Sequence, residues 1–423
     1  MSGKHSLSAR QVRSLVDGRD LQELKQALSP DPSDALRLLP ASGKVSRERT
    51  IKLWERIGAP ETLRRELLGE SDPSVYQGNI ENCLGEVRMP VGLAGPLRVH
   101  GLCAQGDYLV PLATTEAALV ASYHRGCALI GEAGGCTAML LYETVGRSPA
   151  FAFRTLAEAG QFIAWVVSQV DHFKKLAAGT TRHGEMIDLG ATFEGNHVYL
   201  TFEFSTGDAS GQNMVTLATQ AVCDAIMAES PVKPERMWVE GNLSGDKKAS
   251  AKSFTTTRGK KVTAEVRIPS ALVEKRLHTT PEELERYWRV SAMGGVLSGS
   301  FGVQGHFANG LAALYLATGQ DVACVAESAV GVTRFEVGDA GELYAAVTLP
   351  GLMIGTVGGG TGLPTQRACL ELMGLAGAGH ARALAEVAAG LMLAGELSII
   401  GAMAAGHFSR AHRKLARERS VGQ

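Results

Sequence analysis

The stretch from Arg154 to Val239 constrains the fold most, because its hydrophobic pattern changes type twice. Apolar residues recur at helical spacing over Leu156 to Leu176, alternate as in a strand over His197 to Phe204, and return to helical spacing over Asn213 to Ala228. A helix, strands and a second helix in this order are typical of a compact α+β module. We therefore expect an α+β fold in which this module is inserted into a larger domain.

The rest of the chain divides around this insertion. The first 80 residues are charged and broken by prolines, with helical patterns over Asp20 to Ala27 and Ser46 to Ile57, which predict a small helical unit. The expected domains are the helical unit 1–80, a large domain in two parts, 81–153 and 251–423, the inserted domain 154–239, and a loop, 240–250, between the insertion and the second part.

Further elements are predicted in the large domain. Thr114 or Thr115 is placed to cap a helix over Glu116 to Ile130, which would put Glu116 in the first helical turn. The second part carries one strand pattern, Lys261 to Ile268, and three helical patterns, Pro281 to Leu297, Gly302 to Thr318 and Arg382 to Ala416.

Composition narrows the class of protein. The 423 residues are 45% hydrophobic and 20% charged with a net charge of −1, so the chain has the size of an enzyme and no electrostatic bias toward nucleic acid. The N-terminus lacks the apolar core of a signal peptide, and the apolar stretches are too short or carry Glu396 and Ser398, so we expect a cytoplasmic protein without a membrane span. Seven scattered cysteines, with neither the CxxC spacing of a zinc site nor the density of a disulfide scaffold, predict reduced thiols.

Residues 241–248, Gly-Asn-Leu-Ser-Gly-Asp-Lys-Lys, place a carboxylate and two ammonium groups in consecutive positions without apolar periodicity. Glu116, Asp321 and His412 also stand beside glycine- or threonine-rich turns and apolar runs, where a scaffold holds charged groups at the edge of a buried site. Any one of these side chains alone would more often be a solvated surface charge. Together with Lys247 they form two acids, an amine and an imidazole, a set suited to moving protons.

Several longer strings occur in a fixed order along the chain: Glu-Asn-Cys-Leu-Gly at 81–85, Ala-Thr-Thr-Glu-Ala-Ala-Leu-Val-Ala-Ser at 113–122, Thr-Gly-Asp-Ala-Ser-Gly-Gln-Asn-Met at 206–214, the 241–248 loop, and Gly-Thr-Val-Gly-Gly-Gly-Thr-Gly-Leu-Pro-Thr-Gln at 355–366. Through them the chain resembles the 3-hydroxy-3-methylglutaryl-CoA (HMG-CoA) reductases, in particular the catalytic portion of the class I form. The resemblance implies reduction of HMG-CoA to mevalonate and CoA with two NADPH per turnover and without a metal. It also implies a ferredoxin-like NADPH-binding domain inserted in a substrate domain, and a homodimer or homotetramer with active sites at subunit interfaces.

Nucleotide binding is assigned mainly by this resemblance. The glycine run beginning at Gly355 lacks the GxGxxG spacing of a Rossmann fold, which we therefore exclude. Glycines still let a backbone approach a pyrophosphate closely. The resemblance places Arg182 at the adenosine 2′-phosphate, which favours NADPH over NADH because a guanidinium can fork onto a phosphate. The cofactor-binding candidates are Arg182, Asp208, Asn213, Gly355, Gly358, Gly359 and Gly360.

Substrate binding is carried over in the same way. The candidates for CoA are Ser122, His124, Arg125, His306 and Asn309, with His124 standing where the family usually has asparagine, and those for the acyl group are Glu81, Asn242, Asp246 and Lys248.

Chemical roles follow from what the implied reduction requires. The Lys247 ammonium is suited to stabilising the oxyanion that forms on hydride transfer, and His412 to protonating the CoA thiolate. Glu116 is the candidate acid for the aldehyde oxygen, which requires a raised pKa. Asp321 either raises the pKa of Glu116 or orients Lys247, and the sequence leaves both roles open.

Some positions depart from the family pattern, namely Ser244, Gly245, Ala117, Ser210 and Gln212, and an arginine expected after the Arg147 to Pro149 turn is replaced by Ala152 or Phe153 unless Arg154 substitutes for it. These positions surround the substrate and the nucleotide. Two other readings therefore stay open, NAD-dependent oxidation of mevalonate and a catalytically silent acyl-CoA-binding homologue.

Overall fold

The computed structural model describes residues 20, 22–23, 44–58, 60–68 and 72–406. The chain separates into two compact units, Met1–Glu86 and Val87–Gln423. Most of the helix expected over Asp20 to Ala27 lies outside the described residues, as does His412.

From residue 44 onward, the described part of the first unit contains the helices α3 (Arg47–Ile57) and α4 (Glu61–Leu68), followed by a short 3₁₀ helix, η1 (Pro73–Tyr76). Ser46 accepts a hydrogen bond from the Arg49 amide and caps α3, while Gly58 ends it in the left-handed conformation. The indole of Trp54, buried on α3, donates to the Leu84 carbonyl at 2.9 Å. The predicted helix from Ser46 to Ile57 is confirmed.

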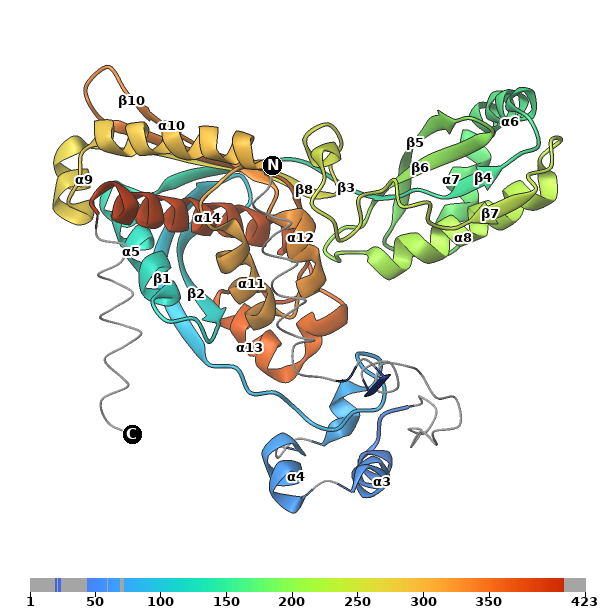
Figure 1. Cartoon of the computed structure of the whole chain (residues 1–423), viewed down its shortest axis with the longest axis horizontal. Helices are drawn as coiled ribbons and strands as arrows, with labels where there is room; N and C mark the ends of the chain where they lie inside the picture. Colours follow the sequence, from blue (N-terminus) through green and yellow to red (C-terminus); the bar gives the residue numbers. More distant parts are fainter. Residues whose placement is uncertain (1–19, 21, 24–43, 59, 69–71, 407–423) are drawn as a thin grey trace. The chain divides into compact units, whose positions relative to one another are not determined.

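A large mixed sheet forms the centre of the second unit (Figure 1). Its strands, in spatial order, are β2 (Gln105–Ala113), β1 (Val91–Gly101), β3 (Cys136–Arg147), β8 (Gly259–Ile268), β11 (Leu343–Leu352), β10 (Gly331–Val337) and β9 (Gly302–Val303). The pairs β1–β3 and β10–β9 are parallel, and the other neighbours are antiparallel.

The inserted part, drawn in green in Figure 1, forms a smaller antiparallel sheet in the order β5 (Glu185–Glu194), β6 (His197–Ser205), β4 (Ala150–Ala152), β7 (Arg236–Trp238). Its helices are α6 (Leu156–Ser168), α7 (Val170–Ala178) and α8 (Gln212–Glu229). The connectivity strand, helices, strand, strand, helix, strand is that of a ferredoxin-like sandwich. An antiparallel sheet with this connectivity is not a Rossmann fold, so the predicted fold class is confirmed.

Strand β3 joins the two sheets. It pairs with β1 and β8 in the large sheet and, near Arg147, with β6 in the small sheet. The chain returns from β7 to the large domain through the loop that contains residues 241–248, before the 3₁₀ helix η2 (Ala251–Phe254) and β8. Arg147 and the 241–248 loop thus both lie where the chain passes between the two sheets.

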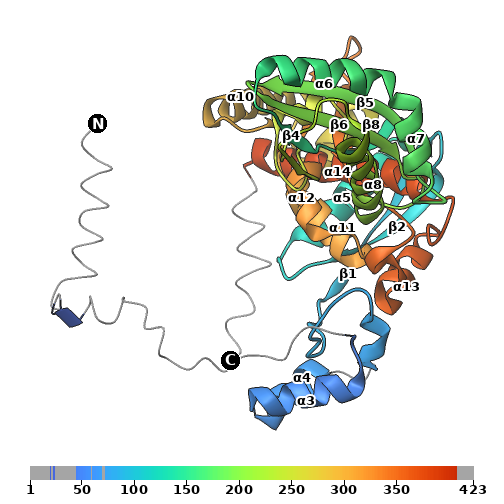
Figure 2. The same cartoon turned by 90° about the vertical axis from the view of Figure 1, so that its right-hand side faces the viewer.

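Helix α14 (Ala381–Ala404) forms the core of the large domain, packed among α5 (Leu119–Glu132), α10 (Pro281–Ser298), α11 (Phe307–Thr318) and the large sheet (Figure 2). It is long and apolar enough to cross a membrane, but 83% of its apolar window is buried inside the protein. That burial is what a core helix shows. Two carboxylates, Glu386 and Glu396, lie fully buried on it.

The remaining short elements surround these helices: α9 (Ser270–Leu277), η3 (Val322–Cys324), α12 (Val325–Ser328), η4 (Gly359–Gly362) and α13 (Pro364–Leu372).

Four predicted helices have different bounds in the structure. Helix α5 begins at Leu119, because Ala118 has a φ of 71°, a left-handed value that cannot continue a right-handed helix. Glu116 therefore lies before the helix and not in its first turn. Helix α11 begins at Phe307, since Gly302–Val303 pairs as a strand with β10. The segment predicted as one helix from Leu156 to Leu176 is divided at Gln169 into α6 and α7, and α14 ends at Ala404.

Candidate active site

Lys247 and Asp321 form an ion pair. The Lys247 Nζ lies 2.8 Å from Asp321 Oδ2, and both side chains remain partly exposed. The hydrogen bond that the Lys247 ammonium donates to Asp321 raises the pKa of Lys247, although burial acts against it. Burial alone would raise the pKa of Asp321, but Lys247 and the Ala323 amide together lower it. Lys247 is therefore held as an ammonium and Asp321 as a carboxylate.

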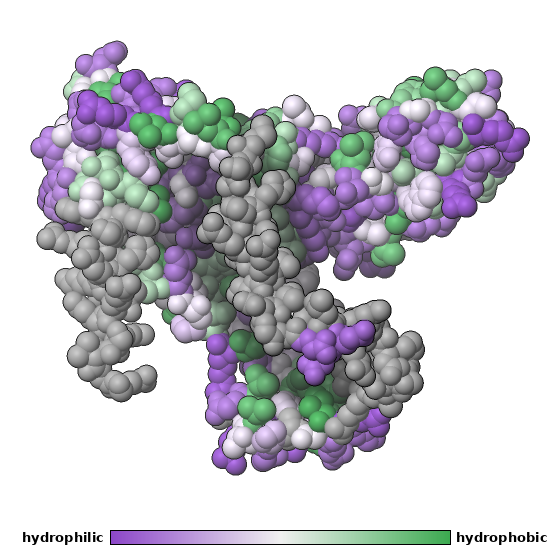
Figure 3. All heavy atoms as spheres, viewed as in Figure 1, coloured by the Kyte–Doolittle hydropathy of each residue, from purple (hydrophilic) through white to green (hydrophobic). Residues whose placement is uncertain are grey.

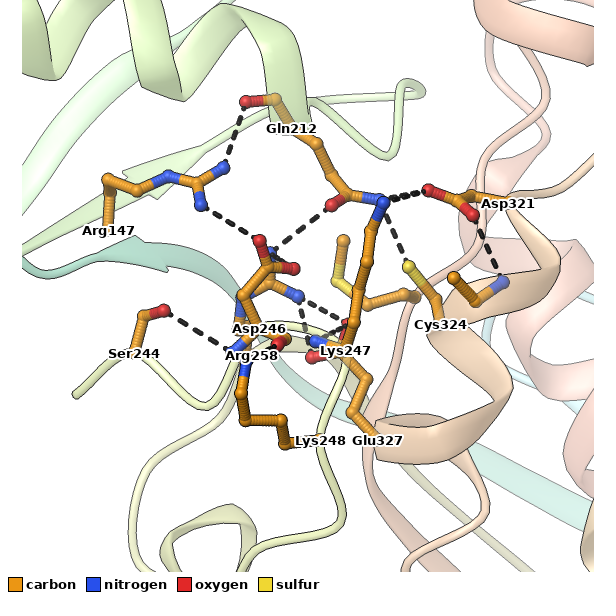
Figure 4. A network of polar contacts seen from close by, with 12 residues as sticks. Arg147, Gln212, Ser244, Asp246, Lys247, Lys248, Arg258, Asp321, Cys324 and Glu327 are labelled. Carbon is orange, nitrogen blue, oxygen red and sulfur yellow. Dashed lines mark hydrogen bonds and ion pairs between the residues drawn. The ribbon is translucent and has the colours of Figure 1, made fainter. Parts of the chain in front are cut away.

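The carboxylate of Asp246, one residue before Lys247, lies between two buried arginines (Figure 4). Its Oδ2 accepts a hydrogen bond from Arg147 Nη1 at 2.9 Å, and its Oδ1 lies 2.7 Å from Arg258 Nη2. Arg147 also lies 3.4 Å from Glu240, whose Oε2 accepts from the Ser244 hydroxyl at 3.0 Å. Asp246 thus fixes the loop to β3 and to the start of β8.

A second carboxylate, Glu327 on α12, also contacts the same loop. Both of its oxygens accept hydrogen bonds from Arg258 Nη1, at 2.5 and 2.6 Å, and its Oε1 accepts from the Lys247 amide at 3.3 Å. Burial raises the pKa of Glu327 even with the Arg258 guanidinium beside it. This carboxyl group is therefore kept in the interior at a cost that its polar contacts offset.

Gln212, the first residue of α8, connects the small domain to this network (Figure 4). Its amide nitrogen lies 3.3 Å from Asp321 Oδ2 and 3.0 Å from the Cys324 sulfur. Its backbone carbonyl accepts from Arg147 Nη2 at 3.4 Å. Since burial raises the pKa of Cys324, this thiol is held in its protonated, unreactive form.

Glu116 lies at a hollow of about 370 Å³ in the large domain. The hollow is formed by the turn from Thr114 to Glu116, by α11 and by Val325 of α12. Glu116 Oε1 is 3.5 Å from the Asn309 amide nitrogen, so two residues predicted for the site face each other across it. Val325 follows the segment that begins with Asp321, and the hollow therefore borders the segment that carries the Lys247 partner.

The residues predicted for CoA binding differ in exposure: His306 is buried, Ser122, Arg125 and Asn309 are half-buried, and His124 is exposed. Ser122 and Arg125 on α5 both hydrogen-bond Ser398 of α14, at 2.8 to 3.1 Å between side-chain atoms. His306 is buried, stacks on Tyr123 and contacts the Gly395 carbonyl through Nε2 at 2.9 Å. Histidine 124, by contrast, is exposed on α5. CoA binding by these residues stays a prediction.

The structure brings the two predicted nucleotide segments together. Ala209 pairs with Val357 in an isolated parallel bridge, and a Cβ on Gly355 would meet the Ser210 amide nitrogen at 2.6 Å. Gly358 and Gly359 have φ values of 76° and 55° and open space where a side chain would stand. An exposed glycine turn of this kind leaves room for a ligand against the backbone.

Asp208 and Arg182 are placed differently around this turn. The Asp208 carboxylate accepts hydrogen bonds from the Gly379 and Ala381 amides at 2.7 and 3.1 Å, and so holds the start of α14. Arg182 is exposed in the loop between α7 and β5. That loop is tied to α8 because the Thr181 hydroxyl donates to the Met214 sulfur at 2.9 Å. Asn213, in the first turn of α8, directly precedes Met214 and is exposed.

The other predicted residues contribute less to the geometry. The Lys248 ammonium donates to the backbone carbonyl of Asp246 at 2.9 Å, and the backbone N–H of Asn242 donates to Glu240 Oε1 at 2.7 Å. Glu81 belongs to the first unit, and His412 lies outside the described residues. Among the described residues, no group of three or more His, Cys, Asp or Glu side chains could hold a metal ion.

Sequence reasoning missed Arg147, Arg258, Glu327 and Glu240. Arg147 served only as a landmark for an arginine expected farther along, and the structure shows Arg147 itself paired with Asp246 of the 241–248 loop. Arg154, the suggested substitute, is exposed and pairs with Glu235 at 3.5 Å. A lone acid in the apolar run from Val322 to Val330 was a usable signal for Glu327, because a charge in such a run must be paired when buried.

The fold and this site define an oxidoreductase of the HMG-CoA reductase type, and comparison with known proteins agrees. The family model described as hydroxymethylglutaryl-coenzyme A reductase matches residues 47–417. The chain therefore belongs to the HMG-CoA reductase family.

Relatives of this name are found in archaea and plants. The chain is 45% identical to the 3-hydroxy-3-methylglutaryl-coenzyme A reductase of Pyrococcus horikoshii over 82% of this chain and 86% of the relative. It is 38% identical to 3-hydroxy-3-methylglutaryl-coenzyme A reductase 2 of Gossypium hirsutum, over 80% of this chain and 56% of that protein. The class II HMG-CoA reductase of Streptococcus pneumoniae, solved with NADPH, is 20% identical with a TM-score of 0.65, and covers 85% of this chain and 97% of its own. That similarity concerns the fold.

Proposed function

We propose that the protein is a class I HMG-CoA reductase that uses two NADPH to convert HMG-CoA to mevalonate and CoA. The observation that carries the proposal is the Lys247–Asp321 ion pair at 2.8 Å, on the loop that joins the two sheets. A site there lies next to both the small domain and the large one, where a reductase needs its reacting groups. The identities of 38 to 45% to reductases, against 20% to a class II enzyme, support the class.

The first step requires an electrophilic thioester carbonyl. NADPH supplies the hydride for each of the two reductions. As the carbonyl oxygen of HMG-CoA gains charge, the Lys247 ammonium stabilises it, and Asp321 orients that ammonium. The resulting hemithioacetal releases CoA as a thiolate, and His412 is the proposed proton donor that keeps the thiolate from adding back.

The second step reduces the aldehyde, mevaldehyde, to the alcohol. Its oxygen needs a proton as the carbonyl is reduced, and Glu116 at the mouth of the hollow is the proposed donor. Asn309, 3.5 Å from Glu116, would hold that carboxyl group in place. Asp246, Lys248 and Asn242 are the proposed contacts to the acyl group, and Ser122, His124, Arg125 and His306 those to CoA.

The glycine turn and the start of α8 fit a dinucleotide. Gly358 and Gly359 expose backbone beside the segment that contains Asp208 and Asn213, and a Cβ on Gly360 would meet the Gly319 carbonyl at 2.6 Å. A nucleotide on this turn would therefore lie near Asp321, two residues after Gly319. Arg182, in the loop tied to α8, is the proposed contact to the 2′-phosphate of NADPH.

The proposed assembly is a homodimer or homotetramer in the cytoplasm. Helix α10 supports self-association, because it exposes Val290, Met293, Val296 and Leu297, each 59% or more accessible. Figure 3 shows hydrophobic residues gathered along α10. A contiguous apolar helix face on the surface marks a contact with another protein surface.

The test is a rate comparison between the parent and two lysine variants. With HMG-CoA as substrate, the parent is expected to oxidise NADPH faster than it oxidises NADH. The Lys247→Ala variant is expected to have a kcat lower by roughly 10²- to 10³-fold. Lys275→Ala, a surface lysine 3.6 Å from Glu132, is the matched control and should keep the parental rate. Preferred oxidation of mevalonate with NAD would favour the oxidative reading, and parental turnover in Lys247→Ala would refute the mechanism.

A further inference from the structure

The short segment from Asp321 to Glu327 contacts both the side chain and the backbone of Lys247. Asp321, directly before η3, pairs with the Lys247 ammonium, and Glu327, six residues later on α12, accepts from the Lys247 amide at 3.3 Å. The side chain and the backbone of the same lysine are therefore set against one rigid element.

Arg258 extends this grip to the residue before Lys247. It donates to both Glu327 oxygens and lies 2.7 Å from Asp246 Oδ1. The Arg258 and Glu327 side chains are only 7% and 3% exposed. The chain Glu327, Arg258, Asp246 thus connects α12 to the loop without passing through the Lys247 ammonium (Figure 4).

Lys247 needs such support because its φ is 56°, a left-handed value that residues with a side chain rarely adopt. A strained conformation of this kind persists only where its surroundings impose it. If the Lys247 amide lost its acceptor, the backbone would relax toward negative φ and redirect the long side chain.

Stability alone does not account for the Glu327–Arg258 pair. A buried ion pair contributes little net stability compared with apolar side chains of the same volume, because desolvation offsets its attraction. Its geometry, by contrast, is demanding, since one guanidinium nitrogen donates to both carboxylate oxygens. The pair is better explained by the conformation it imposes on the loop.

We propose that Glu327 is a positioning residue of the reduction, which acts by fixing the backbone of Lys247 so that its ammonium points at the developing oxyanion. This inference rests on the proposed role of Lys247. Glu327 touches neither substrate nor cofactor in this account, and it acts on kcat by placing Lys247, both directly and through Arg258 and Asp246.

The experiment is a double-mutant cycle on the full chain with Lys247→Ala, Glu327→Gln and the double variant, assayed for kcat and for the KM of HMG-CoA and NADPH. Glutamine keeps the size of the side chain. Its NH₂ group replaces one carboxylate oxygen, however, and cannot accept a hydrogen bond from Arg258 or from the Lys247 amide. Glu327→Asp, which retains the charge but draws it back, serves the same purpose if Glu327→Gln does not fold. The control is Glu386→Gln, a fully buried carboxylate that accepts from the Cys103 and Ala104 amides away from the site.

Glu327→Gln is expected to lower kcat roughly ten- to a hundredfold, as misplacement of a catalytic group by a distant change does, with the KM for NADPH unchanged. In the Lys247→Ala background the same change should have no further effect on kcat, whereas Glu386→Gln should keep the parental kcat per folded molecule. Parental kcat in Glu327→Gln, an equal loss in Glu386→Gln, or a loss that multiplies in the double variant would overturn the inference while Lys247→Ala stays impaired. Parental kcat in Lys247→Ala would instead overturn the proposed function, and this inference with it.

Discussion

Replacing Glu396 by glutamine should destabilise the large domain and weaken acyl-CoA binding at the same time. The fully buried Glu396 carboxylate accepts three hydrogen bonds, with Oε2 bonded to the Gly305 amide at 2.7 Å and the Thr333 hydroxyl at 2.8 Å, and Oε1 to the His306 amide at 2.8 Å. These contacts hold the loop that leads into α11, which carries His306 at its start and Asn309 in its first turn.

The magnitude follows from counting what glutamine can replace. Its amide oxygen can take over the two contacts of Oε2, but its NH₂ group then faces the His306 amide, which is left without an acceptor. An unsatisfied buried amide costs about 1–3 kcal/mol, and each contact that changes from charged to neutral loses about 1 kcal/mol. Because removing a buried charge also relieves its desolvation cost, we expect a net fall of about 2–4 kcal/mol in the free energy of unfolding.

Urea unfolding of the parent and Glu396→Gln at neutral pH measures this difference, provided that the slope with denaturant is the same for both. Steady-state assays on the same samples should show a raised KM for HMG-CoA, since His306 and Asn309 lose their support, with the KM for NADPH unchanged. A stability difference below about 0.5 kcal/mol, the size of an ordinary surface substitution, would refute the reasoning.

Three other outcomes follow from the site. In Asp321→Asn, the hydrogen bond that raises the pKa of Lys247 is weakened and the partner's charge is lost, while burial still lowers that pKa. The loss of activity at high pH should therefore occur at lower pH than in the parent. An unchanged basic limb in the pH profile of kcat would contradict this. Arg182→Ala should raise the KM for NADPH and leave that for NADH unchanged, as measured by initial rates, and equal effects on both would remove Arg182 from the 2′-phosphate. Val290→Asp places a charge on the exposed face of α10 and should shift the protein toward monomer in sedimentation velocity, whereas an unchanged distribution would exclude this face from the interface.

Periodic elements of the fold could be predicted from the sequence because their pattern and caps are local. In α10, Thr280 caps the helix, Pro281 opens it and Glu283 follows in the first turn, and the structure has these contacts. Strand β6 was predicted from its alternation, and its side chains are buried in alternation. By contrast, alanine is an ordinary helix residue, and nothing in the sequence around Ala118 indicates its positive φ. The predicted start of α5 was therefore wrong.

The Lys247–Asp321 pair and the residues around it show the same division between what could and could not be predicted from the sequence. Charged residues next to glycine turns pointed to Lys247 and Asp321, and the structure brings these two together. Arg147 and Arg258 were missed because their partners Asp246 and Glu327 are 99 and 69 residues away, a distance over which spacing carries no information. Buried pairs of this kind depend on how the two sheets meet, which only the folded chain specifies.

The most direct test of the central claim is to count the nicotinamide oxidised per CoA released when the purified protein acts on HMG-CoA with excess NADPH. Two NADPH per CoA are expected, because the thioester and then the aldehyde are reduced in the same site. One NADPH per CoA, with mevaldehyde as the end product, or CoA release without NADPH oxidation would contradict this claim.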